Sequence, residues 1–147
     1  MRAYERAKMS REKDVACAYH LREVAKAKLL ADVRAREAAF ISAAMAFLHS
    51  AGESADAEEI VAYHRIAADC YAAVGDQATA ARYYLLAKEF TQSAMCYRKA
   101  GLFDDAVGVI QNNHDDVYKE PDSEDANVAD SIIDVAKLHY LKKNQLE

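Results

Sequence analysis

Small and large apolar residues follow one another in a register that repeats every thirteen residues between positions 67 and 110. Within each step, a small residue is followed by a large one four positions later, and in the first three steps by a small or apolar one three positions after that. Residues at these spacings share one face of an α-helix, so each step predicts one apolar stripe. The small positions are Ala67, Ala80, Ser93 and Ala106, and the large ones are Tyr71, Tyr84, Tyr97 and Ile110.

Three of these stripes are followed by a residue where a helix is expected to end in a left-handed cap, namely Gly75, Lys88 and Gly101. Each step therefore predicts one short helix and a tight turn, and two steps predict a helical hairpin of twenty-six residues. We expect these short helices at about 77–88, 91–100 and 103–112.

The chain before the repeat also has helical periodicity. Ser10 is a candidate N-cap for a helix over 11–29, and Asp32 is one for a helix over 33–50. One continuous rod is the alternative, but a helix of about forty residues is far above the usual length. A turn is predicted at 52–54, followed by a helix that ends near Val74.

The rhythm breaks after the repeat. Residues 113–127 are acidic, polar and rich in turn-forming residues, which predicts a solvent-exposed acidic loop. A last helix is expected over about 128–143. The acidic residues lack the order of a calcium-binding loop, so we do not expect them to hold a metal.

The 147 residues make about one domain, 1–147, with four glycines and one proline. Residues that favour helices dominate, and no stretch alternates like a strand. The predicted fold is all-α: about seven or eight helices in stacked antiparallel hairpins, which is an α-solenoid. Neither end carries a clear capping element, so we expect a fragment of a larger protein.

The formal net charge of the chain is −5, and it is unevenly distributed. Residues 1–40 carry an excess of basic residues, whereas residues 41–147 carry a larger excess of acidic ones. The acidic excess argues against a general nucleic-acid binder, and a basic helical face is usually only solvated. A functional patch that binds an acidic peptide or a phosphate backbone is the alternative. This candidate basic patch consists of Arg11, Arg22, Lys26, Lys28, Arg34 and Arg36.

The three cysteines form no CxxC pair and no signal peptide precedes them, which indicates reduced thiols in an intracellular protein, cytoplasmic or nuclear. No apolar run approaches the length of a membrane span, so no membrane contact is expected. Cys70 and Cys96 lie beside the buried stripe, where inert packing is expected. Cys17 has His20 three residues away but no third orienting group, so we do not assign it a catalytic role.

No metal, cofactor or catalytic site is predicted. The histidines are not spaced four residues apart on one helix, and a structural zinc site needs about four converging ligands. No Walker A sequence is present, and no acid, base and nucleophile form a recognisable set. The chain is therefore not expected to be an enzyme. The five histidines are His20, His49, His64, His114 and His139.

Most tyrosines fall on the predicted stripes, but Tyr83 and Tyr84 are adjacent and cannot both point into the core. One of them is therefore expected on an exposed surface with Tyr63 or Arg82. Such a surface is a candidate for protein binding, because tyrosine and arginine are enriched at protein-binding hot spots. A half-buried ridge residue without a partner is the alternative. The candidate protein-binding surface is Tyr63, Arg82, Tyr83 and Tyr84.

Residues 70–76 and 96–106 resemble the units of tetratricopeptide-like (TPR-like) α-solenoids. They depart from the standard repeat, because the hairpin has twenty-six residues rather than about 34 and lacks its tryptophan. The stretches 18–23, 97–107 and 131–138 further resemble the helical region of large fungal proteins that combine TPR and ankyrin repeats with a UvrD-like helicase module. This resemblance covers most of the chain.

The resemblance implies a scaffold attached to an ATP-driven nucleic-acid motor that lies elsewhere in a parent protein. We therefore expect a non-catalytic protein-interaction scaffold or spacer module, with a protein as its partner. The alternative is a nucleic-acid-proximal accessory domain of a helicase-like ATPase, which would contact nucleic acid through the basic N-terminal face.

Overall fold

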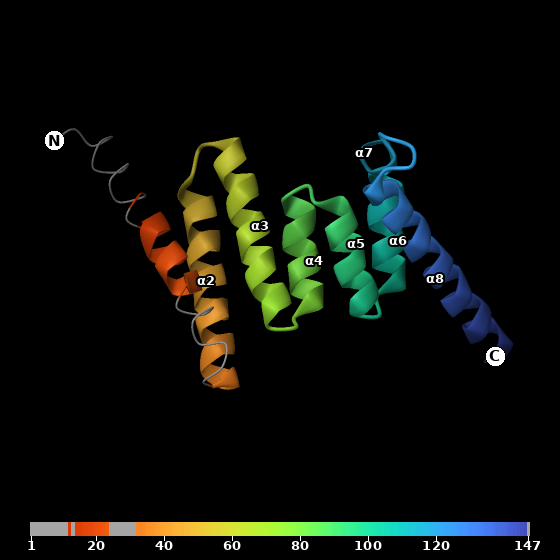
Figure 1. Cartoon of the computed structure of the whole chain (residues 1–147), viewed down its shortest axis with the longest axis horizontal. Coiled ribbons are helices and arrows are strands. Elements are labelled where there is room, and N and C mark those ends of the chain that lie inside the picture. Colours follow the sequence, from red (N-terminus) through yellow and green to blue (C-terminus); the bar gives the residue numbers. More distant parts are fainter. Residues whose placement is uncertain (1–11, 13, 24–31, 147) are drawn as a thin grey trace.

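The computed structural model of the chain describes residues 12, 14–23 and 32–146. Within these ranges every regular element is helical, and the 8 helices confirm the all-α prediction. Figure 1 shows the helices standing side by side along one axis. After the helical stretch 14–23, the labelled helices are α2 (Val33–Glu53), α3 (Ala57–Ala73), α4 (Gln77–Leu86), α5 (Phe90–Lys99), α6 (Phe103–Asn112), α7 (His114–Val117) and α8 (Glu124–Leu146).

Each helix from α2 to α6 packs mainly against its neighbours in the sequence, which is the arrangement of a solenoid. Helix α8 departs from this order, because it contacts both α5 and α6 and then diverges from the stack (Figure 1). Helices α4, α5 and α6 have 10 residues each. Helices that short are marginal in water alone, so packing between neighbours must stabilise them.

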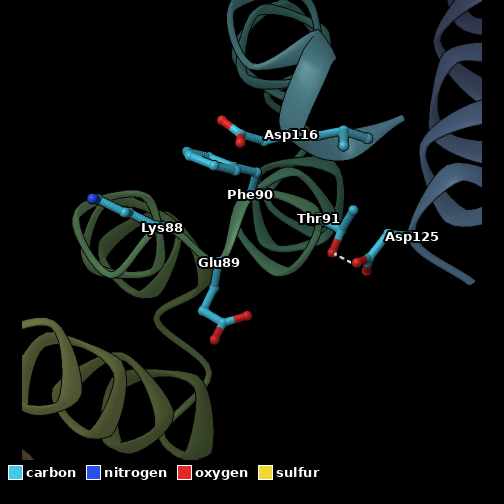
Figure 2. A pocket seen from close by; sticks show the side chains of 7 residues that line it. Lys88, Glu89, Phe90, Thr91, Asp116 and Asp125 are labelled. Carbon is cyan, nitrogen blue, oxygen red and sulfur yellow. Dashed lines mark hydrogen bonds between the residues drawn. The ribbon is translucent and has the colours of Figure 1, made fainter. Parts of the chain in front are cut away.

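The three predicted caps are identical in structure. Gly75, Lys88 and Gly101 have φ angles of 84°, 61° and 79°, which lie in the left-handed region. In every case the next residue donates its N–H to the tyrosine carbonyl five positions back, as in Asp76 to Tyr71 at 3.0 Å. This is a Schellman motif, and its last residue serves as the N-cap of the following helix. The side chain of Lys88 extends from the α4–α5 turn in Figure 2.

The small positions of the repeat form the contact between successive helices. Ala67, Ala80, Ser93 and Ala106 are all 0% exposed. Alanine at these positions lets two helices approach closely. Ser93 is the one polar member, and its hydroxyl donates to the carbonyl oxygen of Ala81 on α4 at 2.7 Å. A buried hydroxyl is therefore satisfied without opening the contact.

The large positions alternate between two environments. Tyr84 on α4 and Ile110 on α6 are buried, whereas Tyr71 on α3 and Tyr97 on α5 are half-buried. The alternation has a period of two helices, which agrees with a hairpin rather than a single helix as the repeating unit. The prediction that the tyrosine stripe faces inward is thus correct in full only for every second helix.

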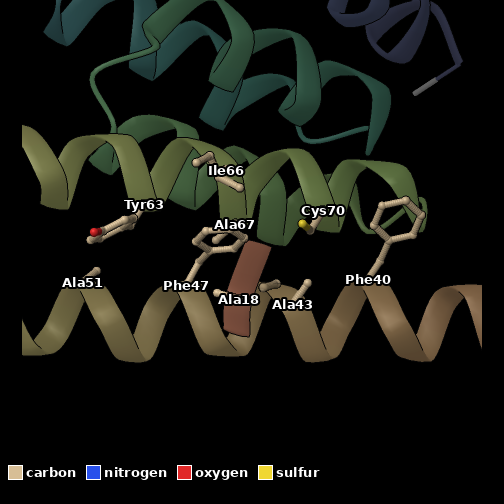
Figure 3. Close-up of a cluster of buried hydrophobic side chains, with 10 residues drawn as sticks. Ala18, Phe40, Ala43, Phe47, Ala51, Tyr63, Ile66, Ala67 and Cys70 are labelled. Carbon is tan, nitrogen blue, oxygen red and sulfur yellow. The ribbon is translucent and has the colours of Figure 1, made fainter. Parts of the chain in front are cut away.

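Phe47 lies at the centre of the first core cluster and is 0% exposed. Figure 3 shows it between α2 and α3, with Ala18 of the helical stretch 14–23 close by. Its ring meets that of Tyr19 edge to face at 5.1 Å, and it lies 6.3 Å from the ring of Tyr63 on α3. One side chain therefore joins three helices.

The break before α2 is confirmed. Asp32 has an extended backbone, and its carboxylate accepts the N–H of Arg34 at 3.0 Å, so the helix begins at Val33. The predicted end of α2 near residue 50 was wrong, because Gly52 belongs to the helix and the turn begins at Ser54. The chain leaves α2 through an extended Ser54, and no left-handed glycine is needed there.

The range 113–127, predicted as one acidic loop, is partly helical in the structure. Its residues form the one-turn helix α7 and the first turn of α8, and Val117 and Ala126 in these two pieces are buried. The hydroxyl of Ser123 accepts the N–H of Ala126 at 3.1 Å and so begins α8 four residues earlier than predicted. The acidic side chains of the segment are exposed, as expected.

Replacement of glycine by alanine is expected to change stability in opposite directions at Gly101 and Gly108. Neither added Cβ would meet another atom within 4 Å, so the backbone decides the outcome. At Gly101, the left-handed conformation should cost alanine about 1–2 kcal/mol. Gly108 is inside α6, where alanine should stabilise by about 0.5–1 kcal/mol. Urea denaturation of both variants measures the difference, and equal midpoints would contradict the assigned cap.

Candidate functional site

The structure separates the four residues of the predicted protein-binding surface into two pairs. Tyr63 and Tyr84 are each 7% exposed and belong to core clusters. Arg82 is exposed, and Tyr83 is half-buried on the same helix. Of the two adjacent tyrosines, Tyr84 therefore points inward and Tyr83 outward.

Tyr84 has a structural partner. Its hydroxyl donates to the carboxylate of Asp69 on α3, which links α3 to α4. Burial raises the pKa of Tyr84, and the hydrogen bond to Asp69 raises it further. The phenol therefore stays protonated, and the sequence-based assignment of Tyr84 to an exposed surface has no support in its position.

Tyr83 lies between two rings of α3. Its ring is 5.7 Å from that of Tyr71, with an angle of 13° between the planes, and 6.1 Å from that of His64, with an angle of 15°. These three residues form a stack that we call the ring row. Near-parallel aromatic rings at such distances attract one another, so the ring row is a pre-ordered part of the surface.

Tyr97 of α5 extends this surface to a third helix. Tyr71, Tyr83 and Tyr97 all pack against one buried cluster, made of Ala68, Ala80, Ala81, Tyr84 and Cys96. Sequence reasoning treated Tyr71 and Tyr97 as core. Their separation of twenty-six residues was the available signal, because residues one hairpin apart fall on the same face of the stack.

The hydroxyl groups of Tyr71 and Tyr97 stay protonated at neutral pH. Burial raises the pKa of Tyr71, with further contributions from Tyr83 and Asp76, and burial raises the pKa of Tyr97, with a contribution from Asp105. The guanidinium of Arg82 opposes both shifts. Both hydroxyls are therefore hydrogen-bond donors at neutral pH.

We refer to this region as the Tyr–Arg surface. Its apolar area is extended by Leu86, which is 56% exposed and lies one helical turn beyond Arg82 on α4. Residues that combine large rings, a guanidinium and an aliphatic side chain are suited to contact with another protein. The Tyr–Arg surface consists of Tyr71, Arg82, Tyr83, Leu86 and Tyr97.

The buried edge of His64 predicts a pH dependence of stability. Burial lowers the pKa of His64, and its Nδ1 atom has no hydrogen-bond partner among the described residues. As pH falls through 6.5, the ordinary pKa of histidine, the unfolded chain takes up the proton first, so stability falls below that pH. His64→Gln should flatten the loss of unfolding free energy between about pH 7 and pH 5. Parallel curves for the two proteins would contradict this assignment, since their other histidines are shared.

The structure describes half of the predicted basic patch. Arg34 is exposed, and Arg22 and Arg36 are half-buried. The Nε atom of Arg36 is buried without a hydrogen-bond partner among the described residues. Arg11, Lys26 and Lys28 lie outside the described residues, so convergence of the six basic side chains stays a prediction.

Two shallow hollows are lined by residues of both α5 and α8. One, of about 360 Å³, is lined by residues of α5, α7 and α8, and in it the hydroxyl of Thr91 donates to Asp125 at 2.9 Å (Figure 2). The other, of about 520 Å³, lies between α5 and α8, with Met95 and Ile132 among its lining residues. Neither hollow is lined by a histidine or a cysteine.

The described residues contain no group of histidine, cysteine, aspartate or glutamate side chains that could hold a metal ion. Cys70 and Cys96 are buried and belong to no disulfide, and burial raises the pKa of Cys96, which disfavours the reactive thiolate. Cys17 is exposed. These positions agree with inert packing for the two cysteines of the repeat.

No protein-family model, no curated protein and no solved structure matches this chain. The resemblance to TPR-like proteins with a helicase module therefore stays a prediction. Among the described helices, none is long and apolar enough to cross a membrane. The all-α solenoid and its Tyr–Arg surface are thus the features on which a functional proposal can rest.

Proposed function

We propose that this chain is a non-catalytic protein-interaction module that recognises its partner through the Tyr–Arg surface. One observation carries the proposal: half-buried tyrosines from α3, α4 and α5 pack on one buried cluster, and an exposed arginine of α4 adjoins it in the sequence. Tyrosine and arginine are the residues most often found at the energetic centre of protein interfaces, together with tryptophan.

The packing beneath these side chains favours binding, because it holds them in place before a partner arrives. The rings pack on 0%-exposed alanines, and Tyr83 is held between Tyr71 and His64. Side chains that are already ordered lose little conformational entropy when a partner binds, which leaves more of the contact energy as affinity. A solenoid also displays such residues on an extended surface.

The chemistry of the same residues favours recognition over catalysis. A guanidinium stays charged, and the raised pKa values of Tyr71 and Tyr97 keep their phenols protonated at neutral pH. None of these groups can act as a general base there. We further propose an intracellular location, because the described cysteines form no disulfide, which fits a reducing compartment.

The test is affinity capture from an extract of the source cells, with the wild-type chain and the double variant Arg82→Ala/Tyr83→Ala as baits. Retention of the specific partner should fall by roughly tenfold or more, as expected for loss of hot-spot residues. Circular dichroism and urea denaturation establish that the variant is folded.

The chain offers a matched control pair. Tyr118 is half-buried and Lys119 is exposed, so Tyr118→Ala/Lys119→Ala removes a tyrosine and a basic side chain from the segment between α7 and α8. That variant should retain the partner. If both double variants capture the same proteins as the wild type, the Tyr–Arg surface is not the binding site.

A further inference from the structure

Arg82 is placed between two tyrosines of neighbouring helices. Helix α4 packs against α3 on one side and α5 on the other, and Tyr71 and Tyr97 both contact the buried cluster to which Ala80 and Ala81 of α4 belong. Arg82 follows Ala81 directly and is exposed. Its charge acts on the hydroxyls of both tyrosines. The three side chains therefore share one region of the surface.

Each of these three side chains offers hydrogen-bond donors at neutral pH, and only the two phenol oxygens can also accept. The guanidinium of Arg82 carries five N–H groups and no acceptor, and the two protonated phenols add one O–H each. A group of donors around a fixed positive charge matches a carboxylate, which accepts two N–H bonds from arginine in a fork geometry. An amide or a hydroxyl would use only part of this donor set.

The surroundings limit the charge of the bound group. Asp76 acts on Tyr71 and Asp105 acts on Tyr97, so each tyrosine also has an acidic neighbour. A run of acidic residues, or a phosphate backbone, would bring further negative charge towards these carboxylates. A single carboxylate at Arg82 gains the attraction of the guanidinium and meets less of that repulsion than a run of negative charges would.

An apolar area lies next to this donor group. Leu86 is one helical turn from Arg82 on α4 and is 56% exposed, and the half-buried ring of Tyr83 adjoins Arg82. A partner segment that carries an apolar side chain about one helical turn from its carboxylate would cover both parts together.

We propose that the Tyr–Arg surface binds a partner segment with a single aspartate or glutamate, whose carboxylate is held by Arg82 between Tyr71 and Tyr97. An aliphatic or aromatic side chain of the same segment lies on Tyr83 and Leu86. This inference rests on the proposed interaction function and adds the chemistry of the partner.

A phage-displayed library of random peptides of about twelve residues, selected on the full chain, tests the inference. The enriched peptides should carry one acidic residue three or four positions from an apolar one. For a synthetic peptide of that kind, Arg82→Ala should raise Kd by roughly tenfold, and exchange of the peptide's glutamate for glutamine should have a similar effect. The control Lys119→Ala should leave Kd unchanged.

A charge exchange makes the test specific for this contact. Arg82→Glu should abolish binding of the acidic peptide and should allow binding of the same peptide with lysine in place of glutamate. Enrichment of basic or uncharged peptides that depend on Tyr83 would overturn the carboxylate assignment and leave the proposed function standing. Absence of enriched peptides, or peptides insensitive to Arg82 and Tyr83 substitutions, would overturn both.

Discussion

Phe47→Ala is expected to lower the free energy of unfolding by about 3–5 kcal/mol, the usual cost of truncating a buried phenylalanine. Phe47 is 0% exposed and contacts rings from two other helices, Tyr19 at 5.1 Å and Tyr63 at 6.3 Å. The cavity would lie where the helical stretch 14–23, α2 and α3 meet. Because small domains have a total stability of about 5–15 kcal/mol, this loss is large enough to shift the urea midpoint strongly.

Met45→Ala provides the control for this prediction. Met45 lies on the same helix but is 61% exposed, so its truncation should change stability by no more than about 0.5 kcal/mol. Equal losses for the two variants would mean that Phe47 does not join the three helices as described.

Ala80→Leu is expected to be the second most damaging substitution, although it adds apolar volume. Ala80 is 0% exposed and belongs to the buried cluster that α3, α4 and α5 share. Three additional carbon atoms have no space there, and overpacking of this kind costs about 1–3 kcal/mol, or more if the helices must separate. The urea midpoint should fall, and the tyrosines that cover the cluster should become more accessible to solvent.

Ala73→Leu separates overpacking from any general effect of leucine in a helix. Ala73 is exposed at the end of α3, and leucine has nearly the same helix propensity as alanine. This variant should have nearly the stability of the wild type. A neutral result at Ala80 as well would show that the small position is not confined between helices.

The regular part of the fold could be predicted because local rules determine it. Gly75, Lys88 and Gly101 mark left-handed caps, and α4, α5 and α6 begin within one residue of the predicted starts. The helical periodicity alone was enough to predict that the small position of each step faces the neighbouring helices. Asp32 likewise marked the beginning of α2 through its capping carboxylate.

The candidate site was only half predictable, because it depends on contacts between helices. Arg82 and Tyr83 follow from the amphipathic pattern of α4, but the stack of Tyr83 on Tyr71 and His64 depends on how far α4 is shifted along α3. Helix α7 was not predicted, because three of its four residues are polar and only Val117 is buried. The amino-acid composition of such a segment predicts which side chains are exposed. It does not predict the backbone conformation, which here depends on the burial of one apolar residue.

Thiol labelling of single cysteines is the most direct test of the stacked arrangement. In a background in which the native cysteines are replaced by serine or alanine, one cysteine is placed in turn at Ala67, Ala80, Ser93, Ala106 or the exposed Ala73. We predict labelling roughly a hundredfold or more slower at the four small positions than at position 73, because a reagent reaches them only when the helices open. The rates should become equal in concentrated urea. A cysteine at any of the four small positions that reacts as fast as the one at position 73 in the folded protein would contradict the stacked-hairpin structure.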